Sequence, residues 1–169
     1  MPYGPYIALT DYKWHIHKGH AFFLHETKYG VAASASFALC ISTVAESEEE
    51  IHVYFGAMGT GGIKMQVFED VAISTLLGYG TPITPHNHKR ASLTAVLASM
   101  WLDPLTDKVS DWGTQIKEDW AGANRKVSGT VDAHEEMILS ENTVYIINVE
   151  SAGADNTITG YLHMYVDYS

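Results

Sequence analysis

Cysteine is almost absent from this sequence: Cys40 is the only one among 169 residues. A lone thiol excludes an intramolecular disulfide, so the fold must be stabilised by its core. Cys40 lies in a run whose alternate positions, from Ser34 to Ser42, all carry small residues. This pattern predicts a packed small side chain rather than a nucleophile.

Long apolar runs are also missing. No stretch reaches the roughly 18 consecutive apolar residues that a membrane-spanning helix requires. The opening Met1–Pro5 lacks the basic and apolar regions of a secretory signal peptide. We therefore expect a soluble protein that is made in a cytoplasm and has no membrane partner.

Positive charge is scarce as well. Ten Lys and Arg residues are outnumbered by twenty Asp and Glu residues, which gives a formal net charge of −10. Binding to a phosphate backbone requires a basic surface. The composition therefore argues against a nucleic-acid partner.

Familiar catalytic motifs do not occur. There is no Gly-x-Ser-x-Gly nucleophile elbow. The glycine-rich stretch Gly56–Gly62 lacks the Lys-Ser/Thr ending of a phosphate loop. The adjacent acidic pairs Glu69-Asp70 and Glu135-Glu136 would point to opposite faces of a strand, which does not suit paired carboxylate catalysis. We expect no catalytic or cofactor-binding residues and no enzymatic activity.

Two His-x-His pairs are the candidates for a metal site. His15-x-His17 would place two imidazoles on one face of a strand, but no Asp, Glu or Cys follows at a matching offset. His86-x-His88 resembles the start of a cupin metal motif, yet Lys89-Arg90 stand where that pattern leads to a glutamate. The sequence therefore predicts neither a metal nor any other cofactor.

Strand patterns, by contrast, are abundant. Residues 157–168 alternate strictly, with Ile158, Leu162, Met164 and Val166 on one side and Gly160 as the only gap. Thr143–Glu150 is rich in Val, Ile and Tyr. The Gly/Asp/Asn link between these segments predicts that they pair as an antiparallel hairpin.

Further strands are expected along the chain, at residues 12–28, 31–43, 51–55, 63–67, 71–79 and 92–101. The segments 51–55 and 63–67 are expected to form a second hairpin. About eight to ten strands, regular glycine-rich turns and no long helix predict an all-β fold, a jelly roll or antiparallel β-sandwich.

Three regions organise the chain. Residues 1–13 read as an extended N-terminal arm, because Pro2, Gly4 and Pro5 disfavour a helix. Residues 14–169 are expected to form a single jelly-roll domain. Within it, residues 102–132 read as a long irregular loop, and loops of that length are usually functional.

The segment 80–92 carries a family resemblance. It begins Gly-Thr-Pro-Ile-Thr-Pro and continues His-Asn-His-Lys-Arg-Ala-Ser. Residues 136–145, with Glu-Met-Ile-Leu followed by Asn-Thr-Val-Tyr, and residues 16–22 add shorter matches. Together, over roughly residues 15–168, they resemble head proteins of tailed bacteriophages that are encoded near the major capsid protein. The chain departs from the motif where His86-Asn87 and His88-Lys89 replace its Asn-Arg turn.

The resemblance implies a capsid decoration (cement) protein of the jelly-roll type, commonly trimeric. Such a protein is bound to the outer surface of the assembled phage head. Its expected partners are the major capsid protein and itself, as a homotrimer, and its expected location is the virion. Decoration would stabilise the head by mass action, because the protein binds only the assembled state.

Five residues are candidates for capsid or subunit contacts: Tyr3, Tyr6, Arg90, Trp112 and Trp120. Aromatic residues serve as anchors at interfaces, but the same side chains could instead be buried in their own subunit. Arg90 could fix the motif turn or lie on the surface. An alternative function is a carbohydrate-binding jelly-roll module for host or glycan attachment, in which Trp112 or Trp120 stacks on a sugar ring.

Overall fold

The computed structural model describes residues 13–44, 49–73, 80–92, 94, 98–103, 109–122, 129–132 and 136–168. Apart from a short helical segment at residues 13–18, the regular structure of this part of the chain is β. The longer strands are β1 (Ala21–Val31), β2 (Ser36–Thr43), β3 (Glu49–Gly59), β4 (Ile63–Glu69), β10 (Thr114–Ala121), β13 (Val144–Ser151) and β14 (Asn156–Tyr168). The shorter ones are β5 (Ala72–Ile73), β6 (Thr81–Ile83), β7 (His86–Asn87), β8 (Ala98–Leu102), β9 (Val109–Asp111), β11 (Gly129–Asp132) and β12 (Met137–Leu139).

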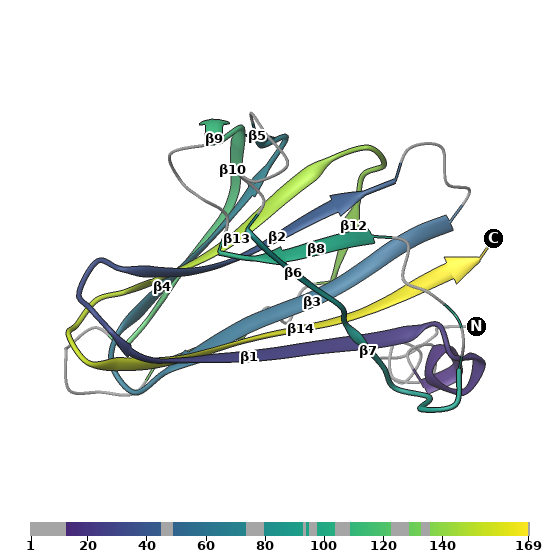
Figure 1. Cartoon of the computed structure of the whole chain (residues 1–169), viewed down its shortest axis with the longest axis horizontal. Helices are drawn as coiled ribbons and strands as arrows, with labels where there is room; N and C mark the ends of the chain where they lie inside the picture. The colour runs from purple at the N-terminus through teal and green to yellow at the C-terminus, as the bar shows by residue number, and fades with distance from the viewer. Residues whose placement is uncertain are drawn as a thin grey trace, which may run out of the picture.

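The strands form two packed sheets (Figure 1). Sheet A has the order β11-β3-β14-β1-β7, with β12 also paired to β3. Sheet B has the order β10-β4-β13-β2-β8-β6, and β5 and β9 form a small separate pair. In the core of this arrangement β1, β14, β3 and β11 lie over β2, β13, β4 and β10, which is the strand order of an eight-stranded jelly roll. The predicted all-β sandwich is confirmed.

Both predicted hairpins are wrong. β13 pairs with β2 and β4 in sheet B, whereas β14 pairs with β1 and β3 in sheet A. β3 and β4 are divided between the sheets in the same way. Short loops fit either a hairpin or an arch between sheets, and the arch is favoured here because it lets both apolar faces meet in one core.

The core lies between the inner faces of the two sheets. On β14, Ile158, Leu162, Met164 and Val166 are at most 1% exposed. From sheet B, Ile63, Met65 and Val67 of β4 and Val149 of β13 are as deeply buried. The period-two alternation in the sequence therefore marks the inward faces correctly.

The expected strand at residues 12–28 begins later than predicted. Residues 13–18 are helical, and the carbonyl of His15 accepts hydrogen bonds from the backbone N–H groups of Gly19 and His20. Gly19 has φ +85°, a left-handed conformation that ends a helix and favours glycine. No helix in the described residues is long and apolar enough to cross a membrane.

The stretch 102–132 is not irregular throughout, since it contains β9, β10 and β11. Its strands escaped detection because β10 is an edge strand with mostly exposed or half-buried side chains, so its sequence lacks an apolar face. The proline-rich segment forms β6 and β7, which both lie at sheet edges, as prolines require. The expected strands at 71–79 and 92–101 are seen only as β5 and β8; the rest of these ranges falls largely outside the described residues, as does the arm up to residue 12.

Candidate functional site

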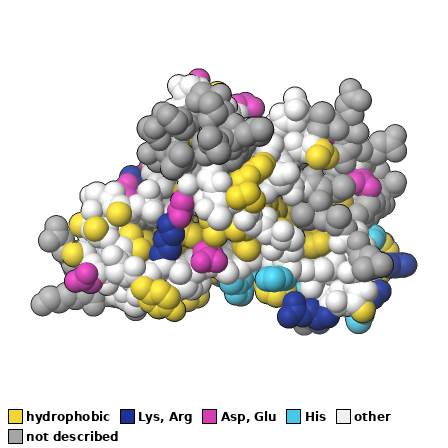
Figure 2. Space-filling view, in the orientation of Figure 1, with side chains coloured by type: hydrophobic (Ala, Val, Ile, Leu, Met, Phe, Trp, Pro, Cys, Tyr) yellow, Lys and Arg dark blue, Asp and Glu magenta, His cyan; other side chains and the backbone are white. Residues whose placement is uncertain are grey.

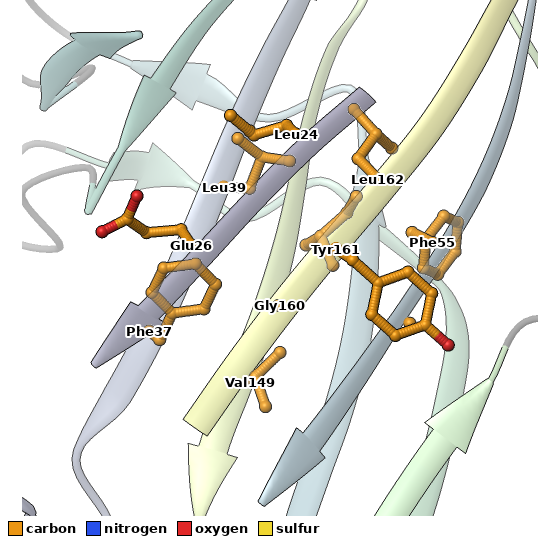
Figure 3. Close-up of a pocket in the computed structure, with 11 residues that line it drawn as sticks. Leu24, Glu26, Phe37, Leu39, Phe55, Val149, Gly160, Tyr161 and Leu162 are labelled. Carbon is orange, nitrogen blue, oxygen red and sulfur yellow. The ribbon is translucent and has the colours of Figure 1, made fainter. Parts of the chain in front are cut away.

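The space between the sheets is filled by side chains. One cavity of about 20 Å³ remains, lined mainly by apolar residues that include Leu24, Phe37 and Phe55 (Figure 3). That volume holds about one water molecule. Glu26 lies at its edge with its carboxylate directed away from the Phe37 ring. This cavity is a packing gap rather than a binding site for an organic ligand.

A larger open groove of about 250 Å³ lies where β6 meets β8. Residues 82–85 line one side and residues 98–101 the other. The proline-rich segment that carries the family resemblance therefore forms a wall of a surface groove.

The outer face of sheet A carries the most distinctive chemistry. One row across the sheet reads His86, Phe23, His163 and Tyr54, on β7, β1, β14 and β3 in turn. His25 and Tyr161 face each other in the next row. We call the side chains of Phe23, His25, Tyr54, His86, His88, Tyr161 and His163 the histidine–aromatic face. Figure 2 shows histidine side chains gathered along the lower edge of the view, where β1 runs in Figure 1.

Three imidazoles of this face contact one another. His25 Nε2 lies 3.4 Å from His163 Nε2, so one ring donates its N–H to the other according to their tautomers. The rings of His88 and His163 stack with centroids 5.7 Å apart. Burial, followed by the charge of His25, holds the pKa of His88 below its ordinary value. These imidazoles are therefore biased towards the neutral form, which is the form that donates a lone pair.

The neighbouring part of the face is closed by the helical segment. Tyr165 is stacked between His15 and His52, with centroid distances of 4.4 and 4.5 Å. Glu136 accepts hydrogen bonds from the Tyr165 hydroxyl and from His52 Nδ1, the latter at 2.8 Å. Burial by itself raises the pKa of Glu136, but the hydrogen bonds from Tyr165, Tyr54 and His52 outweigh it and the net pKa is lowered. This end of the sheet is a satisfied polar network.

The structure separates the histidines that the sequence had grouped. His15 is buried against Tyr165, whereas His17 is exposed on the same helical segment. His86 and His88 both contact the Phe23 ring, at 5.6 and 4.7 Å between centroids. Within the described residues, no group of three or more His, Cys, Asp or Glu side chains has the spacing of a preformed metal site.

Trp120 lies exposed on β10, at the edge of sheet B. Its ring is 65% exposed, its Nε1–H donates to Glu118 at 2.9 Å, and Lys64 Nζ lies 5.3 Å from the ring centroid. The hydrogen bond from Trp120 is also the main cause of the lowered pKa of Glu118. Trp120 is thus an exposed aromatic side chain held in one orientation by two neighbours.

The other contact candidates differ from Trp120 and from one another. Trp112 is half-buried and packs against Phe68 at 5.1 Å between ring centroids, in a small cluster on the outside of sheet B. Arg90 is exposed in the turn that follows β7. Tyr3 and Tyr6 lie outside the described residues. The structure brings none of these residues together with Trp120.

Sequence reasoning missed His25, His163 and Phe23 as members of one site. The alternation Tyr161, His163, Tyr165 was visible as the more polar side of the last strand. What was missing was its partner: β1 pairs with β14 in a register that places Phe23 opposite His163. That pairing joins residues about 140 positions apart, beyond the reach of local patterns.

Comparisons with known proteins are weak. No family model matches the chain, and no curated protein matches it. Among solved structures, hydroquinone 1,2-dioxygenase from Sphingomonas sp. TTNP3 aligns with 89% of this chain and 61% of its own, at 9% identity and TM-score 0.28. A structure of the Gt strain of infectious bursal disease virus aligns over 86% and 40%, at 12% identity and TM-score 0.20. The decameric BFDV capsid protein aligns over 86% and 97%, at 13% identity and TM-score 0.17.

These weak structural neighbours include viral capsid proteins as well as an enzyme. The expectation that the chain has no enzymatic activity is corrected, because the dioxygenase has the highest probability of the three. The likeness is too slight to assign an activity to this chain. The chain spans 61% of the length of that dioxygenase.

Proposed function

We propose that this protein is a capsid decoration protein that binds the outer surface of an assembled phage head and stabilises it. The proposal rests on the motif resemblance in residues 80–92 and 136–145 together with the jelly-roll strand order. Its partners would be the major capsid protein and further copies of itself in a trimer. Its place would be the outside of the virion.

Trp120 is the observation that carries the proposal furthest. Trp is the residue type most often found as an energetic anchor at protein interfaces. Here the ring is exposed, yet Glu118 and Lys64 already fix its orientation. An anchor that is ordered before binding loses little rotamer entropy when it enters a partner's pocket. We therefore expect Trp120 to lie at the centre of the contact with the head.

Stabilisation of the head follows from mass action. A protein that binds the assembled shell and not the free capsid subunit lowers the free energy of the shell by RT ln(1 + [L]/Kd) for each site. At a free concentration 100 times Kd, this amounts to about 2.7 kcal/mol per site. The effect is multiplied by the number of occupied sites on one head.

The test is co-sedimentation of the purified protein with expanded empty heads. We expect the unaltered protein to pellet with heads and Trp120→Ala to remain largely in the supernatant. Trp14→Ala is the matched control, because Trp14 is also exposed (51%) but lies in the helical segment before β1. Equal pelleting of the unaltered protein and Trp120→Ala would show that Trp120 is not the anchor. No pelleting of the unaltered protein would reject decoration.

A glycan-binding module is the second candidate, because an exposed Trp ring also suits stacking on a sugar. The same two variants separate the functions. Binding to a glycan array that is lost in Trp120→Ala, without binding to heads, would favour attachment to a carbohydrate. Binding to heads without a glycan signal would favour decoration.

A further inference from the structure

The histidine–aromatic face contains a nitrogen pair with the spacing of metal ligands. His25 Nε2 and His163 Nε2 lie 3.4 Å apart. Zinc–imidazole bonds are about 2.0–2.1 Å long, so two nitrogens bound tetrahedrally to one ion lie about 3.4 Å apart. The pair therefore needs almost no change in separation to hold one ion between its two lone pairs.

The backbone fixes this pair firmly. His25 and His163 project from β1 and β14, which are adjacent strands inside sheet A and are paired continuously from Ala21 to Lys28. The two residues are diagonal neighbours on one face, since Phe23 stands opposite His163 and His25 opposite Tyr161. Ligands on paired strands are held more precisely than ligands on loops.

His88 supplies a third imidazole beside the pair. Its backbone N–H donates to the Ala21 carbonyl at 2.9 Å, which anchors the turn after β7 to the start of β1. Its ring lies 5.7 Å from the His163 ring and 4.7 Å from the Phe23 ring, between centroids. The three rings do not converge on one point in this structure, but rotation of the His88 side chain would turn a nitrogen towards the pair.

Access and charge also suit an ion. His25 is exposed, while His88 and His163 are half-buried, so the pair is open to solvent on one side and bordered by Phe23 on the other. Lys89 and Arg90 follow in the sequence, but both are exposed, where solvent screens their charge.

We infer that His25, His163 and His88 bind one divalent transition-metal ion, with a fourth coordination position open to water. Imidazole nitrogen selects ions of the zinc, copper and nickel class over magnesium and calcium. The inference does not depend on the proposed decoration function. It assigns a binding site to residues that come from three separate strands or turns.

The experiment is a Zn²⁺ titration of the full chain by isothermal calorimetry. We expect about one ion per chain for the unaltered protein. Loss of an outer partner of a metal ligand commonly weakens affinity 10–100-fold. Loss of a ligand itself, in His25→Ala or His163→Ala, should therefore weaken binding at least about tenfold. His17→Ala removes an exposed histidine outside the cluster and should bind as the unaltered protein does.

Two further readouts make the result decisive. Because His25 is exposed, His25→Ala should unfold at the same temperature as the unaltered protein without metal, so loss of binding cannot be attributed to unfolding. Imidazole NMR signals of His25, His163 and His88 should shift together on addition of Zn²⁺. Binding that is unchanged in both cluster variants would overturn the inference. So would half an ion per chain with dimerisation, or no saturable binding up to about 1 mM Zn²⁺.

Discussion

Replacing Gly160 with alanine should destabilise the fold, although alanine normally suits a strand better. Gly160 faces the core from β14, and a Cβ built there would meet the ring of Phe37 from sheet B. Its distances would be 3.2 Å to Cζ and 3.3 Å to Cδ1, with Cε1 closer still. Carbon atoms in good contact lie about 3.5–4.0 Å apart. The Phe37 ring must therefore move.

The size of the effect follows from two opposing contributions. Overpacking of a core typically costs about 1–3 kcal/mol. The loss of glycine's extra backbone entropy returns about 0.5–1 kcal/mol. The adjoining cavity of about 20 Å³ lets the ring shift only slightly. We expect Gly160→Ala to lower the free energy of unfolding by about 0.5–2 kcal/mol, the difference of these two ranges.

The assay is urea unfolding at 25 °C, in which the midpoint should fall while the slope m stays constant. Gly61→Ala is the matched control, because its new Cβ would make only ordinary contacts of 3.5 Å or more with Asn156. In the double variant Phe37→Leu/Gly160→Ala, the loss should be smaller than the sum of the two single losses. A Gly160→Ala protein as stable as the unaltered one would refute this account of the contact.

Three further outcomes are expected. Asn156→Ala should lower the free energy of unfolding by about 2–4 kcal/mol in urea, because the buried side chain makes four hydrogen bonds, whereas half-buried Asn148→Ala should cost under about 1 kcal/mol; equal losses would contradict this. Burial raises the pKa of Cys40 to about 12, so a thiol reagent should label it only after unfolding, and rapid labelling of the native protein would be inconsistent with this. Burial, and then the charge of Lys18, lower the pKa of His20, so the unfolded chain binds this proton more tightly. Stability should fall as the pH drops below about 6.5, less so in His20→Gln; an unchanged pH dependence in that variant would contradict the assignment.

The fold class was readable from the sequence because inward-facing residues alternate with a period of two. The gap at Gly160 in that alternation was visible too, but its cause was not. The cause is Phe37, which lies on the opposite sheet and more than 120 positions earlier. Pairing partners were not readable for the same reason: a short loop after β13 does not reveal whether the next strand stays in its sheet or crosses to the other.

The candidate site was the least predictable part. The histidines were sought at fixed local spacings, His15-x-His17 and His86-x-His88. The pair that actually meets joins β1 to β14 and is defined by strand register alone. The exposure of Trp120 was likewise unreadable, because it depends on β10 being an edge strand with Lys64 and Glu118 beside the ring.

The place of β14 has a consequence for biosynthesis. This strand lies between β1 and β3, yet it is made more than 100 residues after both begin. While the ribosome is still translating residues 60–150, β1 and β3 have no partner in the middle of their sheet. The nascent chain must keep these strands apart from other nascent chains until residues 156–168 emerge, and a translation product interrupted before that point would expose two apolar strand edges.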